Sequence, residues 1–369
     1  MQRTALLCAL ALAACTHAPG PTTTTPSLDQ AQVAARLPAK LTDREGWASD
    51  VITAIRRTKK EPTAERVCAV LAVIEQESGY AVDPPVAALP SMVKKGLAQR
   101  LEPLGPMAGP VLAGILEGHA PGDERTFGAR LDTLKTERDL DRLFRDVARA
   151  YRDQLPGPLS MIGGGTIEQF NPVTTAGSMQ VKVSFARAHA DGEDDDALRE
   201  LLYTRAGGVR FGTERLIGYP ASYDDITFRF ADYNAGVYAS RNAAFQEQLS
   251  ALVDMKLVPD GDLLSYGKDE EPLDKETQSL RALLAFGATH DVSASTIRSD
   301  VRKEKSAAFE ETTTWKKVRA AWSTKTGLAA PYARVPDVTI ASPKMSKTRT
   351  TAWFASNVKR RYDACRQRG

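Results

Sequence analysis

Apolar residues recur along this chain with a helical period, and that period limits the possible folds more than any other feature of the sequence. Between residues 63 and 79, Val67, Val70, Leu71 and Ile74 stand at positions i, i+3, i+4 and i+7. This spacing places them on one face of an α-helix that Thr63 can cap and Gly79 can end. Strand-like alternation is sparse, and residues 180–185 are its best candidate. The sequence therefore predicts a mainly α-helical fold.

The rest of the chain divides into further helical stretches and polar connections. Amphipathic patterns predict helices at residues 129–154, 196–218, 225–253, 278–287 and 294–323. Residues 84–125 contain many Pro and Gly, which is typical of irregular connections around one short helix. The polar residues 254–277 predict a boundary, and residues 331–343 are expected to be extended.

The first fifteen residues, MQRTALLCALALAAC, have the pattern of a secretory signal. Arg3 provides a positive charge, and the apolar run that follows is too short to cross roughly 30 Å of hydrocarbon. Residues 12–15 resemble the bacterial lipobox. In that motif the Cys becomes the mature N-terminus and carries acyl chains, which include palmitate. Thr16 after it favours the outer membrane by the same resemblance. The alternative is an ordinary signal peptide in which Cys15 is incidental.

These patterns predict a signal peptide at residues 1–14 and a lipidated tether at residues 15–27, which is rich in Pro and Thr and cannot bury apolar surface. The expected location is the periplasmic face of the outer membrane, with lipid on Cys15 as the membrane contact. The chain has 49 basic and 46 acidic residues. This balance excludes a dedicated nucleic-acid binder.

Two of the four cysteines remain for the folded body once Cys8 is removed with the signal and Cys15 is lipidated. Two thiols in an oxidising periplasm predict a disulfide between Cys68 and Cys365. The alternative is that Cys68, which lies in an apolar run, is a free buried thiol. The segment from Lys344 onward carries eight basic residues and one acid. It is expected to be a solvated helix end, or a contact for anionic lipid or for peptidoglycan carboxylates.

Glu77 is the sharpest chemical feature of the sequence. It ends the apolar helix near the buried stripe, whereas Glu75 lies on the other flank. A carboxylate at the inner edge of a helix end is costly unless it is paired, hydrogen-bonded or protonated. Burial there would raise its pKa, as a general acid for glycoside cleavage requires. An exposed Glu near a helix end is the alternative.

Three further segments accompany Glu77-Ser78. They are Gly177-Ser178-Met179-Gln180, the glycine-rich start of a helix at residues 207–212, and Tyr233-Asn234-Ala235-Gly236. In this order the four motifs resemble those of soluble-lytic-transglycosylase-like enzymes, relatives of goose-type lysozyme, over residues 75–250. The whole chain also resembles an uncharacterised bacterial lipoprotein family.

The transglycosylase resemblance implies a role for each matching residue. Glu77 would be the catalytic acid and base, and Ser78 would orient the substrate. Met179 and Gln180 would line the glycan groove, while Tyr233 and Asn234 would contact sugar near the scissile bond. It further implies a lysozyme-like helical domain at residues 28–253. A hundred residues separate Glu77 from Gly177, where the family has a short connection, so an insertion is expected at about residues 86–160. A mostly helical C-terminal extension would follow at residues 254–369.

The expected chemistry follows from the absence of a second candidate acid beside Glu77. Some glycosidases use the substrate's own N-acetyl group in place of a second carboxylate. Glu77 would then protonate the leaving oxygen and take the proton of the muramyl 6-hydroxyl, giving a 1,6-anhydro sugar. The partner is peptidoglycan, and neither a metal nor another cofactor is implied. The alternative function is a non-catalytic envelope lipoprotein that binds peptidoglycan or scaffolds a complex.

Overall fold

The computed structural model describes residues 25–151, 171–267, 271–340 and 348–368. The prediction of a mainly α-helical fold is confirmed, because the described strands form only two small antiparallel hairpins. The first pairs β1 (Thr175–Ala176) with β2 (Val181–Lys182), and the second pairs β3 (Thr339–Ile340) with β4 (Arg349–Thr350). The predicted signal peptide and Cys15 lie outside the described residues.

Among the described residues, eight helices pack around the main hydrophobic core. They are α1 (Gln30–Arg36), α2 (Arg44–Arg57), α3 (Ala64–Glu77), α9 (Val183–Ala188), α10 (Asp195–Leu202), α11 (Arg205–Ile217), α12 (Ile226–Ala235) and α17 (Thr351–Gln367). Thr63 caps α3 as predicted. Every residue from Val67 to Ile74 is buried, so α3 is the central helix and has no wet face in this stretch.

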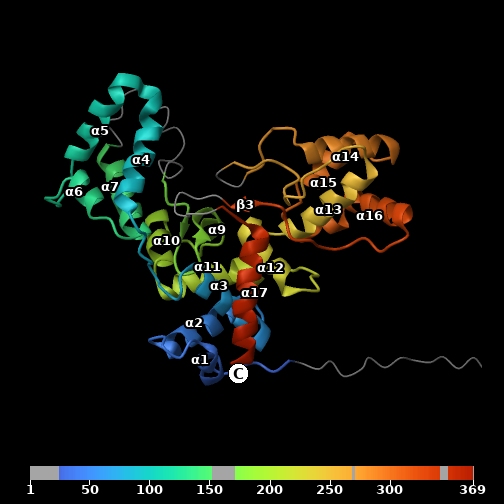
Figure 1. Ribbon diagram of the computed structural model, residues 1–369, viewed down its shortest axis with the longest axis horizontal. Helices are drawn as coiled ribbons and strands as arrows, with labels where there is room; N and C mark the ends of the chain where they lie inside the picture. Colours follow the sequence, from blue (N-terminus) through green and yellow to red (C-terminus); the bar gives the residue numbers. More distant parts are fainter. Residues whose placement is uncertain (1–24, 152–170, 268–270, 341–347, 369) are drawn as a thin grey trace, which may run out of the picture.

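The C-terminal helix α17 returns to this core and lies along α3 and α12 (Figure 1). The predicted disulfide is confirmed, because Cys68 of α3 is bonded to Cys365 of α17 with their Cα atoms 5.5 Å apart. The alternative of a free Cys68 thiol is therefore wrong. Phe354, Val358 and Tyr362 are buried and dock this helix on the core, whereas the basic Arg360, Arg366 and Arg368 are exposed, as expected of a solvated helix end.

A second core lies in the C-terminal part of the chain. It contains α13 (Ala239–Leu252), α14 (Gln278–Thr289), α15 (Ala294–Val301), η3 (Ala307–Glu311) and α16 (Thr313–Thr326). The fully buried carboxylate of Glu304 accepts hydrogen bonds from the backbone N–H groups of Leu263 and Leu264, at 2.6 and 2.8 Å, and from the Tyr266 hydroxyl at 2.7 Å. These bonds fix the loop that leads from α13 to α14.

A third core is formed within the predicted insertion. Its elements are α4 (Leu89–Leu101), η1 (Glu102–Met107), α5 (Ala108–Glu117), α6 (Phe127–Asp132) and α7 (Glu137–Tyr151). In Figure 1 this cluster and the C-terminal cluster lie on either side of the central core. Residues 84–125 are therefore more helical than their Pro and Gly content predicts. Pro90 and Pro110 fall in the first turns of α4 and α5, where a missing N–H breaks no helical hydrogen bond.

Several predicted long helices are interrupted by side chains that cap a new helix. The predicted helix at 129–154 is two helices, because the Asp139 carboxylate accepts hydrogen bonds from the backbone N–H groups of Lys135 and Thr136 at the start of α7. The helix predicted at 196–218 is broken where Thr204 caps α11. The strand predicted at 180–185 is limited to β2, and α9 begins directly after it.

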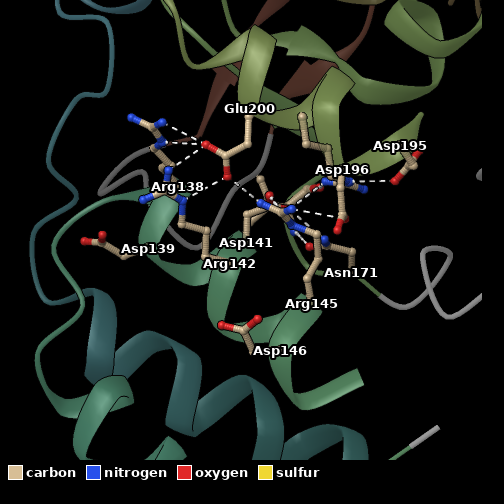
Figure 2. A network of polar contacts seen from close by, with 12 residues as sticks. Arg138, Asp139, Asp141, Arg142, Arg145, Asp146, Asn171, Asp195, Asp196 and Glu200 are labelled. Carbon is tan, nitrogen blue, oxygen red and sulfur yellow. Dashed lines mark hydrogen bonds and ion pairs between the residues drawn. The ribbon is translucent and has the colours of Figure 1, made fainter. Parts of the chain in front are cut away.

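An ionic network joins the insertion to the central core (Figure 2). Glu200 of α10 accepts hydrogen bonds from Arg138, Arg142 and Arg145 of α7, at 2.8, 2.6 and 2.7 Å. The bond from Arg142, followed by those from the other two, holds the pKa of Glu200 well below its usual range. Beside it, the fully buried Asp141 accepts from Arg199 at 2.7 Å. Burial raises the pKa of Asp141 despite that arginine.

We predict that Glu200→Gln lowers the free energy of unfolding at pH 7 by about 1 kcal/mol, because three arginines lose a shared and partly exposed counter-charge. A depressed folded-state pKa contributes stability above the unfolded pKa and loses it as the pH falls. The difference from wild type should therefore shrink below about pH 4. Urea unfolding at pH 7 and pH 3 checks this, with the exposed Glu117→Gln as control. Equal midpoints for wild type and Glu200→Gln at pH 7 would contradict it.

Candidate active site

Glu77 is the last residue of α3, and its side chain is only partly exposed. Burial raises the pKa of Glu77 to about 8, while the positive charge of Arg215 opposes this rise. Within the described part of the chain, no hydrogen bond or ion pair engages this carboxylate. Glu77 is therefore mostly protonated at neutral pH and retains a proton that it can donate.

Glu75 lies only two residues away but has a different environment. Its carboxylate faces α17, where it pairs with Arg361 at 3.7 Å and with Arg368 at 3.9 Å. These arginines neutralise the charge of Glu75 and tie the end of α3 to the C-terminal helix. The two carboxylates thus have separate surroundings, and Glu77 is the one held in a poorly solvated site.

Ser78 is the C-cap residue that follows α3, and its hydroxyl donates to the Ile74 carbonyl at 3.1 Å. Gly79 follows with a φ of +59°, a left-handed conformation that suits glycine. The hydroxyl of Ser78 is thus used in closing the helix. Its predicted contact with substrate stays a prediction.

The Gly177–Gln180 turn joins β1 to β2 and packs against α11. Gly177 has a φ of +78°, and a Cβ there would lie 2.2 Å from the Leu202 carbonyl oxygen, so only glycine fits. The buried side chain of Met179 lies against Gly212 of α11, where a Cβ would come 2.3 Å from its sulfur. The glycines of α11 therefore allow this turn to approach the helix closely.

Gln180 and Met179 take part in internal contacts at this turn. The Gln180 side chain accepts from the Thr175 hydroxyl at 2.9 Å and donates to the Gly177 carbonyl at 3.3 Å. Met179 is fully buried, and its carbonyl accepts a 2.7 Å hydrogen bond from the Tyr233 hydroxyl. Both residues fix the turn, and their predicted contact with a glycan stays a prediction.

Tyr233 connects this turn to α12 and to Arg215. The Arg215 guanidinium donates to the Tyr233 carbonyl at 3.3 and 3.4 Å. Burial raises the pKa of Tyr233, and the negative charge of Glu77 raises it further. The two groups therefore interact electrostatically, although they come from helices far apart in the sequence.

Asn234 has a partner in the C-terminal helix. Its side-chain oxygen accepts a 2.8 Å hydrogen bond from the Thr351 hydroxyl at the start of α17. Gly236 then ends α12 with a φ of +134°. The Tyr233–Gly236 motif is therefore held by the turn on one side and by α17 on the other.

The structure thus connects Glu77 and Tyr233 through one buried arginine, Arg215, and connects Met179 to them through the Tyr233 hydroxyl. Sequence reasoning placed Arg215 in a helix and gave it no role in the site. The signal that could have found it is its position on the buried face of the helix at 205–217, three and four residues after Gly212 and Phe211.

Metal-binding clusters and membrane-spanning helices are two further features that a chain of this kind could contain. Within residues 25–151, 171–267, 271–340 and 348–368, no group of three or more His, Cys, Asp or Glu side chains is placed to hold a metal ion. None of the helices in these same ranges has the length and apolarity that a membrane span requires.

Comparison with known proteins places the chain in a family. Residues 40–368 match the family described as "Protein of unknown function (DUF1615)". The "Uncharacterized protein YaiW" of Escherichia coli (strain K12) is 38% identical over 367 residues, which cover 98% of this chain and 96% of that relative. No solved structure matches the chain. Since both matches extend over most of its length, the chain belongs to the DUF1615 family, as its resemblance to an uncharacterised bacterial family predicts.

Proposed function

We propose that this protein is a peptidoglycan lytic transglycosylase that cleaves the bond between N-acetylmuramic acid and N-acetylglucosamine. The observation that carries the proposal is the state of Glu77, a carboxyl group held protonated near neutral pH by burial and left without a hydrogen-bond partner among the described residues. A general acid works best when its pKa lies near the working pH. The motif order around Glu77 supplies the reaction class.

The surroundings of Glu77 support a mechanism with one protein carboxylate. Among the described residues, Arg215 is the charged group that acts on the pKa of Glu77, and no described carboxylate does so. Glu77 would protonate the departing glycosidic oxygen while the substrate's N-acetyl oxygen attacks the anomeric carbon. The resulting Glu77 carboxylate would then remove the proton of the muramyl 6-hydroxyl. That oxygen closes the 1,6-anhydro ring, so no water is consumed.

Arg215 would influence both proton transfers of this reaction, from Glu77 to the leaving oxygen and from the 6-hydroxyl to Glu77. Its positive charge lowers the pKa of Glu77, whereas burial raises it by more. The opposing effects keep the proton transferable without making the carboxylate a strong base. The hydrogen bonds of Arg215 to the Tyr233 carbonyl fix the position of that charge.

The direct test is incubation of the purified protein with peptidoglycan sacculi, followed by mass spectrometry of the released products. Anhydro-muropeptides are expected. Products with a reducing end instead would identify a hydrolase, and intact sacculi would contradict enzymatic activity.

The same proposal includes a lipid anchor at Cys15, motivated by the signal-like and lipobox-like N-terminal residues. We predict that Cys15→Ala leaves the protein unlipidated and soluble in the periplasm, because two acyl signals are generally needed for stable anchoring and none would remain. Fractionation after labelling with a palmitate analogue checks this. Cys8→Ala is the matched control and should stay in the outer membrane. An unchanged lipid label on Cys15→Ala would contradict the assignment.

A specific observation favours the second candidate, a non-catalytic protein that binds peptidoglycan or scaffolds an envelope complex. Asn234 is engaged by Thr351 of α17, and the Met179 side chain is fully buried. The resemblance assigns both side chains to glycan contact, but in this structure both are engaged in contacts within the protein. Binding to sacculi without product release would support this candidate.

A further inference from the structure

A cavity of about 420 Å³ lies where the central core meets the C-terminal cluster. One wall comes from α9 and from the end of α11, and another from Gly236–Tyr238, which follows α12. The third wall is Lys305–Ala307, between α15 and η3. The cavity is therefore completed by the C-terminal part of the chain, outside the segment that resembles transglycosylases.

Aromatic rings line two sides of this cavity. Phe185 is stacked on His189 with ring centroids 4.1 Å apart, and Tyr219 meets the edge of Tyr238 at 5.0 Å. Flat aromatic surfaces with polar edges suit the apolar faces of sugar rings and peptide planes.

The charged groups of the cavity are mostly cations. Among the described residues, Lys182, Arg215 and Lys305 line it together with the carboxylate of Glu214, and Lys305 is also paired with Asp262. Arg215 is 5% exposed, and its hydrogen bonds go to the Tyr233 carbonyl, with no carboxylate paired to it among the described residues. The carboxyl of Glu77 acts on Arg215 electrostatically but forms no ion pair with it. A buried guanidinium without an ion-paired carboxylate is costly, so a ligand that brings a negative charge would be favoured.

Lys305 is held in place by its own cluster. Its ammonium donates to Asp262 at 2.9 Å and lies 4.1 Å from the centre of the Tyr266 ring. It also lies 3.6 Å from where a Cβ on Gly236 would stand, an ordinary van der Waals distance. The C-terminal cluster thus presents a fixed cation to the end of the Tyr233–Gly236 motif.

We propose that this cavity is a subsite for a carboxylate-bearing muramyl saccharide, with Lys305 and Arg215 binding the carboxylate and the aromatic walls holding the attached rings or peptide. This inference rests on the proposed function, since it names the part of peptidoglycan that the neighbouring site would take. The carboxylate belongs either to the peptide branch or to the lactyl group of a glycan without peptide. In both cases the cavity should select muramyl glycans over uncharged ones.

The test measures binding by calorimetry to the full mature chain carrying Cys15→Ala and Glu77→Gln, so that it is soluble and turns nothing over. Three probes separate the possibilities: N-acetylglucosamine tetramer, which is uncharged; the GlcNAc–MurNAc disaccharide, which carries the lactyl carboxylate; and the disaccharide-tetrapeptide, which carries peptide carboxylates. At least one acidic probe should bind about tenfold tighter than the tetramer. The acidic probe that binds more tightly shows whether the bound carboxylate belongs to the lactyl group or to the peptide.

Lys305→Gln should weaken binding of the preferred acidic probe about fivefold and leave binding of the tetramer unchanged. Lys305→Arg should retain the preference. The control is Lys303→Gln, an exposed lysine two residues away that does not line the cavity. Equal affinity for all three probes, no binding of any, or an equal effect of Lys305→Gln on all of them would overturn the subsite.

Failure of the subsite is distinguishable from failure of the proposed function. If the wild type releases no anhydro-muropeptides but the charge preference and its dependence on Lys305 are found, only the catalytic proposal fails. If anhydro-muropeptides are released but Lys305→Gln changes no binding, only the subsite fails.

Discussion

Glu77→Gln should reduce the release of anhydro-muropeptides from sacculi by at least 10³-fold. Glutamine keeps the size of the side chain but has no transferable proton, and general acid–base catalysis typically contributes roughly 10²–10⁴-fold. A residue that acts first as acid and then as base in the same turnover should lie at the upper end of that range. The measurement is the rate of anhydro-muropeptide formation by mass spectrometry, with circular dichroism to show that the variant is folded.

Glu75→Gln is the matched control for this experiment. It makes the same chemical change two residues away, at a carboxylate paired with Arg361 and Arg368 of α17. We expect at most a few-fold loss of activity, because these pairs are long and partly exposed and affect stability more than chemistry. Equal rates for wild type and Glu77→Gln would eliminate Glu77 as the catalytic acid. A comparable loss in both variants would indicate that the end of α3 had been disturbed.

The same variant should change the pH dependence of stability. The pKa of Glu77 is raised from 4.5 to about 8 on folding. The native protein therefore binds this proton more tightly than the unfolded chain, so the stabilisation is complete below about pH 4.5 and is lost as the pH rises through 8. The Glu77→Gln variant has no ionisable group at this position, so its stability does not fall with pH for this reason. We expect similar unfolding free energies for the two proteins at pH 5, and a more stable variant at pH 8, with a slope difference of at most about 1.4 kcal/mol per pH unit.

The local features of α3 could be predicted from the sequence because they depend on nearby residues. Thr63 caps the helix, and the apolar run is buried as its composition suggests. The environments of Glu75 and Glu77 differ as helical geometry requires. That the helix is buried all round could not be predicted, because the covering helix α17 lies almost three hundred residues away along the chain.

Helix boundaries were harder to predict wherever a short polar side chain competes with the helical backbone. The hydroxyls of Thr204 and Thr136 each accept a hydrogen bond from the backbone N–H three residues on and start a new helix inside an unbroken amphipathic pattern. Pro90 and Pro110 suggested irregular structure but occupy first turns, where proline is tolerated. In both cases the apolar period is correct, and only the position of the cap decides where each helix begins.

In the candidate site, residue types were easier to predict than contacts. The sequence shows Gly177 and Gly212 as glycines in neighbouring motifs. The reason that glycine is required at both positions is steric, because the turn that contains Met179 packs directly onto α11. Arg215 was missed as a site residue because its partners, the Tyr233 carbonyl and the charge of Glu77, come from other helices. Side chains that act across three helices leave little trace in any one of them.

Removal of the disulfide should have the largest effect on stability. The bond between Cys68 and Cys365 closes a loop with a sequence separation of 297 residues. Cross-linking so long a loop restricts the unfolded chain, and loss of such a bond typically costs roughly 2–5 kcal/mol. The double variant Cys68→Ala, Cys365→Ala should therefore unfold at a clearly lower denaturant concentration than the oxidised wild type, with a similar native circular dichroism spectrum.

The native spectrum should survive because α17 has other contacts with the core. Phe354, Val358 and Tyr362 are buried, and Thr351 donates to Asn234. Wild type treated with reductant should lose the same stability as the double variant, whereas reductant should not affect the variant itself. Activity on sacculi should be retained under conditions where α17 stays docked. Equal midpoints for the variant and the oxidised wild type would mean that packing alone fixes α17, and that the covalent link between the two helices contributes nothing to the stability of the fold.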